Sequence, residues 1–317
     1  MKVTEHIKSS KKTLFSFELL PPLKGQNFEE IKKSIDSLLE YDPAYINVTY
    51  HQEEVIYKKH EGGLLEKKTV RKRPGTVGIA AAIKFTFNVD VVPHIICGGF
   101  SMEETENALI DLHFLEIDNL FVVRGDPEKS QKHFIPESDG HEHSIDLVKQ
   151  IINLNKGNYI DEDLLNTTPT KFCIGVAGYP EKHIEAPNMQ TDISFLKCKV
   201  EEGAEYIVTQ MFFDNRKYFD FVNLCRANGI NVPIIPGLKP IAVKDHVTYL
   251  PKTFNIDVPF ELVKEVEKCK DNKQARAVGI EWASMQAKEL IKANVPVLHF
   301  YTMGKTDNIK KIAQNIF

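Results

Sequence analysis

The stretch LFVVRGDP, residues Leu120 to Pro127, ends an apolar run with a cation, a glycine and an anion. The run 120–123 has no polar alternation, which is typical of a parallel strand buried on both faces. Charged residues directly after such a strand lie at its carboxyl end, where α/β proteins place their sites. The stretch therefore predicts a buried strand followed by a functional loop. The alternative is an exposed adhesion tripeptide.

Short apolar runs of the same kind recur along the whole chain. They lie at 14–19, 45–48, 91–95, 120–123, 172–176, 206–209, 233–235 and 296–300. Eight such runs separated by helical segments predict an α/β protein, a (βα)8 TIM barrel with an extra helix around 260–269 before the last βα unit. A doubly wound sheet is the competing architecture, but no G-x-G-x-x-G follows the first run.

The segments between the runs carry helix signals. Asn27-x-x-Glu30 resembles a capping box and precedes apolar residues at helical spacing. Ser101 to Glu104 opens a later helix in the same way, with Leu109 and Leu112 on its inner stripe. The basic run 67–73 is interpreted as a solvated loop that leads into the next helix, in preference to a nucleic-acid patch.

Composition excludes several classes of protein. The 317 residues carry a formal charge of -4, and 42% are hydrophobic, which indicates a globular protein without a general attraction to nucleic acid. The N-terminal residues show no apolar signal region, and no apolar stretch is long enough to span a bilayer. The five cysteines form no CxxC pair, which suits neither a disulfide framework nor a metal site. We expect one catalytic domain over 1–317 in the cytoplasm, with no metal, membrane or nucleic-acid partner.

Polar or aromatic side chains lie at or just after the ends of seven of the eight runs. Because parallel strands end at one rim of a barrel, we expect these side chains to meet there. They are Glu18, Thr49, Tyr50, His94, Arg124, Gly125, Asp126, Tyr179, Gln210 and the triplet His299, Phe300 and Tyr301.

Two of these residues invite a chemical interpretation from their neighbours alone. Glu18 lies in FSFELLPP, and apolar surroundings raise the pKa of a carboxyl group, which suits a general acid. A structural glutamate paired with a cation is the alternative. His94 can equally be a core residue with satisfied hydrogen bonds, and no acidic or cysteine neighbour suggests a metal.

Eight motifs together resemble the methylenetetrahydrofolate reductase family, from about Phe15 to Lys305. They are FSFELLPP, INVTY, PHIICGG, VRGDP, VAGYPEKHIEA, TQMFFD, IIPGLKPI and LHFYTMGK, in the family's order. The resemblance is to the flavin-dependent catalytic barrel of the bacterial type, and we expect these 317 residues not to include the regulatory domain of the animal enzymes.

The resemblance implies a reaction and its residues. NADH or NADPH would reduce FAD, and the flavin would pass hydride to methylenetetrahydrofolate, which gives methyltetrahydrofolate for methionine synthesis. Glu18 matches the family's general acid, Asp126 an aspartate that contacts pterin and flavin, and Gln210 a substrate-binding glutamine. Residues that match FAD-contacting positions are Thr49, Tyr50, His94, Arg124, Gly125, Asp126, Tyr179, His183, Ala186, Asp192 and Lys199.

The sequence leaves alternatives open. Asp192 could cap its helix, and Lys199 could be a solvated helix residue. The segment 51–76 is longer and more charged than the enterobacterial pattern, and Lys305 stands where the family has arginine. A folate-binding methyltransferase and an RGD-displaying binding protein compete with the reductase. The choice between NADH and NADPH and the formation of homo-oligomers, common in the family, stay open.

Overall fold

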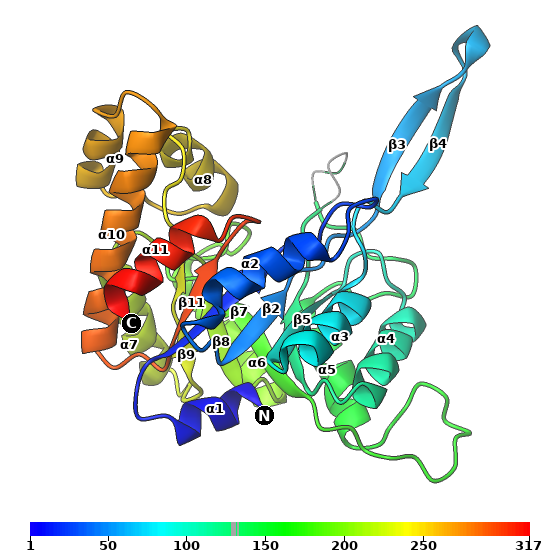
Figure 1. Cartoon of the computed structure of the whole chain (residues 1–317). Helices are drawn as coiled ribbons and strands as arrows, with labels where there is room; N and C mark the ends of the chain where they lie inside the picture. The colour runs from blue at the N-terminus through cyan, green and yellow to red at the C-terminus, as the bar shows by residue number, and fades with distance from the viewer. Residues whose placement is uncertain (128–130, 132) are drawn as a thin grey trace.

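One sheet of parallel strands closes into a barrel (Figure 1). The computed structural model describes residues 1–127, 131 and 133–317. Within these residues the barrel sheet has nine strands in the order β10-β11-β1-β2-β5-β6-β7-β8-β9. Their bounds are β1 Leu14–Leu19, β2 Tyr45–Val48, β5 Asp90–Ile96, β6 Asn119–Val123, β7 Cys173–Gly178, β8 Tyr206–Thr209, β9 Ile234–Ile235, β10 Gly237–Leu238 and β11 Val297–Tyr301. The predicted (βα)8 barrel is confirmed, and the first, second and sixth predicted strands have the predicted bounds.

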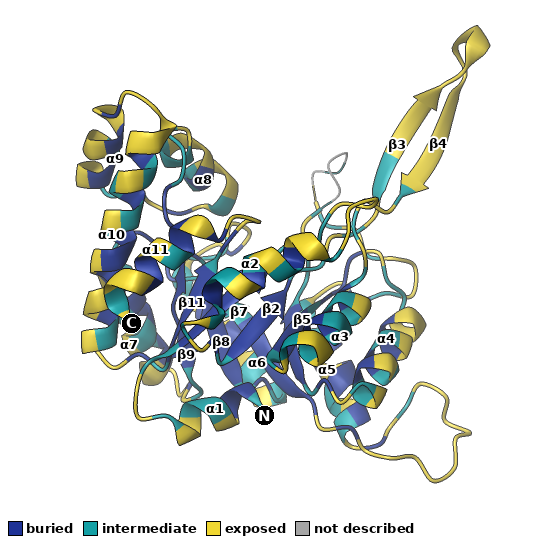
Figure 2. Cartoon of the chain, viewed as in Figure 1, coloured by how far each residue is buried: buried dark blue, intermediate teal, exposed yellow. Residues whose placement is uncertain are grey.

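The helices surround the barrel and bury the faces that meet the strands (Figure 2). Their bounds are α1 Val3–Ser9, α2 Glu29–Leu39, α3 Thr76–Phe87, α4 Met102–Phe114, α5 Ser144–Asn155, α6 Met189–Glu202, α7 Asn215–Ala227, α8 His246–Phe254, α9 Phe260–Glu267, α10 Asn272–Lys292 and α11 Asp307–Ile316. The extra helix before the last βα unit is therefore present as α9, and α8 precedes it.

The two predicted helix starts have different outcomes. Ser101 caps α4 as predicted, since its side chain accepts from the Glu104 N–H and the Glu104 side chain accepts from the Ser101 N–H. The predicted capping box at Asn27 is wrong. Phe28 occupies the cap position of α2, and no side chain caps that end.

The barrel closes at a seam between β9 and β10. The predicted strand 233–235 corresponds to β9, and a second short strand, β10, follows Pro236, which has no N–H to donate. β9 pairs with β8, and β10 pairs with β11, so the two pieces join the ends of the sheet. A Cβ on Gly237 would lie 2.4 Å from the Thr209 carbonyl oxygen, so only glycine allows this approach.

Side chains that alternate inward fill the barrel. Tyr45, Val92, Phe121 and Tyr206 belong to an interior cluster that also contains Val3 of α1. The Val3 N–H donates to Asn119 Oδ1 at 2.8 Å, which holds α1 across the amino end of the barrel. The carboxyl ends of the strands form the opposite mouth.

A long hairpin projects from the mouth between β2 and α3 (Figure 1). Its strands are β3 Glu54–Lys59 and β4 Leu65–Val70, joined around the 3-10 turn Glu61–Gly63. The interpretation of 67–73 as a loop is therefore wrong for 67–70, which pair with β3, although the segment is solvent-exposed. Valine, isoleucine and threonine on the two lysine-rich strands give the hairpin its β preference.

Across the residues that the structure describes, no helix combines the length and the apolar character needed to cross a membrane.

Candidate functional site

The predicted site residues converge on the carboxyl mouth of the barrel. Glu18 is the penultimate residue of β1, and Arg124 and Tyr179 directly follow β6 and β7. Because all barrel strands run parallel, these ends share one side of the sheet. Thr49 and Tyr50 follow β2, His94 lies in β5, Gly125 and Asp126 follow Arg124, Gln210 follows β8, His183 and Ala186 lie in the β7–α6 loop, and Asp192 and Lys199 lie on α6.

Glu18 points into the barrel just below the mouth. Its neighbours Phe17 and Leu19 belong to the outer core, the cluster of buried side chains shared by the barrel strands and the surrounding helices. Because side chains alternate along a strand, Glu18 points inward, where it is only 8% exposed. Burial raises the pKa of this carboxyl group to about 7, and the Lys239 ammonium opposes part of that rise. Glu18 is thus a carboxyl group that is partly protonated at neutral pH, which is the property a general acid needs.

Lys239 is a buried charged residue at this mouth that is not among the residues predicted from the sequence. It follows β10, is 5% exposed, and has its pKa lowered to about 8 by burial, with Glu18 acting in the opposite sense. The signal was present in the motif IIPGLKPI, where the lysine is the charged residue of an otherwise apolar strand end.

A layer of neutral polar groups lies beneath the mouth. Ser16 Oγ is 2.9 Å from His299 Nδ1, and Asn47 Nδ2 is 3.1 Å from His94 Nε2. Burial lowers the pKa of both histidines to about 3, so both rings are uncharged at neutral pH. Asn47 Oδ1 is buried and has no hydrogen-bond partner among the described residues. His94 is therefore a hydrogen-bonded residue of the barrel core, and it also borders the mouth.

A charged cluster joins the end of β6 to the β7–α6 loop. Arg124 donates two hydrogen bonds of 2.7 Å to the carboxylate of Glu185, and its guanidinium lies 5.0 Å from the ring of Phe134. The rings of Tyr179 and His183 meet edge-on with centroids 4.7 Å apart. These contacts fix the loop against the strand end, and the guanidinium keeps three N–H donors free of Glu185.

Lys199 and Asp192 anchor this cluster from α6. Lys199 Nζ donates to the Ala177 carbonyl at 3.3 Å, and burial lowers its pKa to about 8. Lys199 is therefore half-buried against β7, and the alternative of a solvated helix residue is wrong. Asn188 caps α6, and Asp192 instead accepts from the His183 N–H at 2.8 Å. The helix-cap alternative for Asp192 is also wrong.

The remaining predicted residues border the same region. Gly125 has φ +89, a conformation that favours glycine, and the Asp126 carbonyl accepts from Gln52 Nε2 at 3.0 Å. The Thr49 N–H donates to the Leu19 carbonyl at 3.0 Å, which ties the start of the β2 loop to β1.

Three further residues that were predicted to contact a ligand make interactions with their neighbours. The Tyr50 ring packs on Phe100 at 5.1 Å. The buried Ala186 accepts at its carbonyl from Lys182 Nζ at 2.6 Å. Gln210 Oε1 accepts from the Met211 N–H at 2.9 Å, so its NH2 group is the donor it would offer to a ligand.

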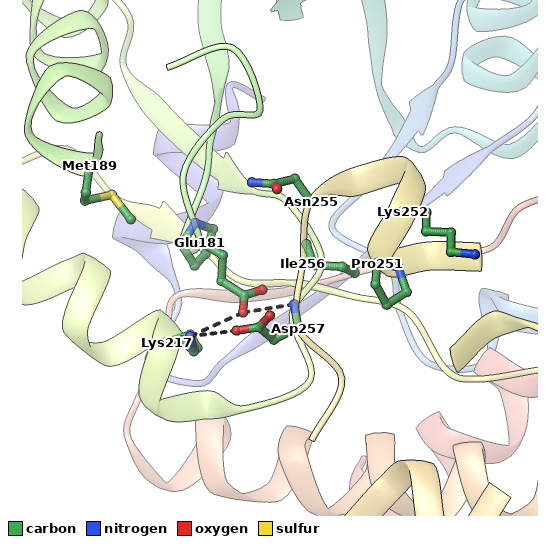
Figure 3. A pocket seen from close by; sticks show the side chains of 9 residues that line it. Glu181, Met189, Lys217, Pro251, Lys252, Asn255, Ile256 and Asp257 are labelled. Carbon is green, nitrogen blue, oxygen red and sulfur yellow. Dashed lines mark hydrogen bonds and ion pairs between the residues drawn. The ribbon is translucent and has the colours of Figure 1, made fainter. Parts of the chain in front are cut away.

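A cavity of about 580 Å³ lies beside the mouth (Figure 3). Pro180, Glu181, Lys217 and Asn255 are among its lining residues, and Lys217 bridges the Glu181 and Asp257 carboxylates at 3.5 and 3.1 Å. None of the predicted site residues lines this cavity, although Pro180 directly follows Tyr179. In the part of the chain that the structure describes, no group of three His, Cys, Asp or Glu side chains is placed to hold a metal ion.

The family model described as "Methylenetetrahydrofolate reductase" matches residues 2–316. The chain belongs to the methylenetetrahydrofolate reductase family. The resemblance predicted from the eight motifs is thereby confirmed.

Curated relatives carry the same name. The chain is 32% identical to "Methylenetetrahydrofolate reductase (NADH) 1" of Arabidopsis thaliana, over 100% of this chain and 51% of that protein. It is 28% identical to "5,10-methylenetetrahydrofolate reductase" of Escherichia coli, over 92% of this chain and 86% of that protein. The chain spans about half the length of the first of these and of the related plant and yeast proteins.

A solved structure supports the fold alone. The chain superposes with a TM-score of 0.56 and 14% identity on a Clostridium thermocellum protein described as uncharacterized and as binding two copies of 5-methyl-5,6,7,8-tetrahydrofolic acid. The match covers 99% of this chain and 98% of that one. The match therefore supports a barrel fold over the whole of this chain.

Proposed function

We propose that this chain, as a single catalytic domain, reduces 5,10-methylenetetrahydrofolate to 5-methyltetrahydrofolate with FAD as the carrier and NADH or NADPH as the reductant. The observation that supports this best is Glu18, a buried carboxyl group with a pKa of about 7 at the mouth of a reductase-family barrel. The product would feed methionine synthesis, and the five free thiols suit a cytoplasmic enzyme.

The side chains at the mouth fit an FAD molecule. Lys199 and Arg124 supply positive charge for a pyrophosphate, and Lys199 makes no ion pair with a described carboxylate within 4.0 Å. Gly125 leaves backbone N–H groups open to close approach, and the orphaned Asn47 Oδ1 is an acceptor for a ring N–H. Bound FAD would supply hydride transfer from the nicotinamide to the methylene carbon of the folate.

The proposed holders of FAD are the matching residues of the mouth. Tyr179, His183, Asp192 and Lys199 would hold its nucleotide side, while Thr49, Tyr50, His94, Arg124, Gly125 and Ala186 would border the rest. Asp192, Asp126, Arg124 and Glu185 each act electrostatically on Tyr179, which supports one continuous binding region around that ring.

Glu18 would act on the folate. Its proton would go to a nitrogen of the five-membered ring, which favours the open cationic iminium form that accepts hydride. Asp126 and Gln210 would orient the pterin through its ring N–H groups and oxygen. Neutral His94 and His299 below keep the floor of the mouth uncharged, so that Glu18 stays the proton donor.

The test separates the two half-reactions of the purified protein. With FAD added anaerobically, NADH or NADPH should bleach the flavin absorbance, and methylenetetrahydrofolate should restore it. Stopped-flow absorbance gives both rates and identifies the preferred nicotinamide. Protein that takes up no FAD, or whose reduced flavin is not reoxidised by the folate, contradicts the proposal.

A further inference from the structure

Two opposite charges are buried at the mouth without a direct partner. Glu18 is 8% exposed and Lys239 is 5% exposed. Neither side chain makes a hydrogen bond or an ion pair within 4.0 Å with another residue that the structure describes. Each nevertheless acts electrostatically on the other, since Lys239 is the one charge that lowers the pKa of Glu18 and Glu18 the one that raises the pKa of Lys239. Burying two unpaired charges is costly, so such an arrangement calls for a function.

Strand register explains why the two side chains face each other. Leu238 pairs with Phe300, and Phe300 pairs with Phe17, and all three belong to the outer core. Side chains alternate between faces along a strand, so the next residue on each of these three strands points inward. These residues are Lys239, Tyr301 and Glu18. The lysine and the glutamate therefore lie at one level of the barrel, on either side of the strand that carries Tyr301.

Tyr301 does not neutralise either charge. Its hydroxyl donates to the Thr209 carbonyl at 2.6 Å, and burial raises its pKa well above the ordinary value, so it stays a neutral phenol. Asn47, which pairs with Glu18 from β2, is uncharged and points to His94. The lysine is thus the cation that acts on Glu18 among the described residues.

The groups around Lys239 leave that cation dominant. His246, at the start of α8, faces Lys239, and burial followed by the lysine charge lowers its pKa to about 4, so it is neutral at neutral pH. Lys305, in the loop after β11, is exposed and acts on His246. Neither residue acts on Glu18 directly.

We propose that Lys239 is a positioning residue for Glu18, whose ammonium sets the pH range over which the Glu18 carboxyl group keeps its proton at the mouth of the barrel. Burial alone would hold Glu18 protonated to a higher pH than burial together with the cation. The nearby cation opposes burial, and Glu18 can then release its proton near neutral pH and recover it in the next cycle. The kinetic part of this inference rests on the proposed folate reduction, whereas the electrostatic part does not.

The electrostatic part is tested on the FAD-free protein. Difference infrared spectroscopy, with Glu18→Gln as the reference, follows the carboxylic acid band of Glu18 against pH. Lys239→Met removes the cation and keeps the volume, so the midpoint should rise by about one pH unit or more. Lys239→Arg restores a permanent cation and should return the midpoint toward the wild-type value.

Controls keep this measurement decisive. Lys244→Met removes a lysine from the same loop, where Lys244 Nζ donates to the Cys269 carbonyl at 2.6 Å, and it should leave the midpoint unchanged. If Lys239→Met fails to fold, the reciprocal measurement replaces it. Glu18→Gln should lower the Lys239 pKa below about 8, as followed by NMR of labelled lysine side chains. A Glu18 midpoint that does not move in Lys239→Met, or a Lys239 pKa that does not fall in Glu18→Gln, overturns the proposal.

The kinetic part is read from the folate half-reaction. Its alkaline limb should move to higher pH in Lys239→Met by the same amount as the infrared midpoint, which would raise the relative rate there by about tenfold per pH unit. A shifted midpoint with an unmoved kinetic limb overturns the catalytic role of Lys239. A chain that moves the midpoint but reduces no folate refutes the proposed function and leaves the Lys239–Glu18 pair standing.

Discussion

Arg124 and Glu185 form an ion pair with two hydrogen bonds, each 2.7 Å long, which ties the end of β6 to the β7–α6 loop. The pair spans 61 residues of sequence and joins two of the segments proposed to hold FAD. Its geometry depends on the planar fork of arginine. The loop that carries Tyr179 and His183 is therefore positioned by a contact that lysine cannot reproduce.

Arg124→Lys should weaken FAD binding by about tenfold or more, because a lysine makes one contact where arginine makes two. FAD titration by fluorescence quenching measures the change. Lys310→Met, which breaks an exposed ion pair with Glu40 away from the mouth, is the control and should keep wild-type affinity. Equal affinities for wild type and Arg124→Lys would contradict the role of this pair.

Lys199→Met should lower the affinity for FAD and raise the unfolding free energy of the protein. The folded state disfavours the Lys199 ammonium, since its pKa is about 8 against an ordinary 10.5. The free-energy cost of burying this ammonium is fully present below pH 8 and vanishes as pH rises through 10.5. The unfolding free energy of Lys199→Met should therefore exceed that of the wild type by about 1–3 kcal/mol at pH 7, and by progressively less above pH 8. Lys197→Met on the exposed face of α6 should change neither quantity. Urea unfolding at several pH values provides the comparison.

Glu18→Gln should slow the folate half-reaction by about two to four orders of magnitude and leave flavin reduction by the nicotinamide intact. In the wild type, the folate step should decline as pH rises through about 7, since the acid must be protonated to act. Glu106→Gln is a matched control, because Glu106 is a buried glutamate on α4 that accepts from the Ile160 N–H. Equal losses in both half-reactions of Glu18→Gln would remove the acid role.

Gly125→Ala should destabilise the fold by about 1–2 kcal/mol and weaken FAD binding, because φ +89 strains any residue with a Cβ. The cause is the backbone conformation, since a Cβ there would meet Ile96 only at 3.4 Å. Gly78→Ala, inside α3 with open space around the added methyl group, should instead stabilise by about 0.5–1 kcal/mol. The opposite signs, read from chemical unfolding, distinguish the two positions.

Replacing 55–69 of the hairpin by Asn-Gly should leave the unfolding free energy of the barrel within about 1 kcal/mol of the wild type. Ile56, Tyr57, Leu64 and Leu65 are 40% to 72% exposed, and no residue of the segment belongs to a core cluster. Thermal unfolding measures the difference. A large loss of stability would show that the hairpin packs on the body of the protein.

The sequence predicted the parts of the fold that have a strong local pattern. The apolar runs gave the barrel strands, and strand alternation turned Glu18 inward, as its apolar setting suggested. The hairpin was missed because lysines interrupt its apolar alternation, and its pairing of Val55 with Thr69 is not a local signal. Asn27 failed as a cap because α2 begins at Glu29, one residue later than the motif implies.

The sequence predicted only those site residues that lie at the ends of recognisable apolar runs. Lys239 lies two strands from Glu18 in the sheet and more than 200 positions away along the chain, so only the barrel register shows that the two side chains face each other. The Arg124–Glu185 pair was hidden for the same reason. What the residues do with folate, flavin and nicotinamide stays a prediction.

The seam at Pro236 affects where the barrel opens locally. β9 and β10 contribute two residues each, so the sheet is closed by fewer ladder bonds there than between β5 and β6 or β6 and β7. Amide hydrogens of Ile235 and Leu238 should exchange with solvent sooner than those of Val92 and Val122. Local opening at this point would move Lys239 away from Glu18 and widen the mouth of the barrel, while the other strands remain paired.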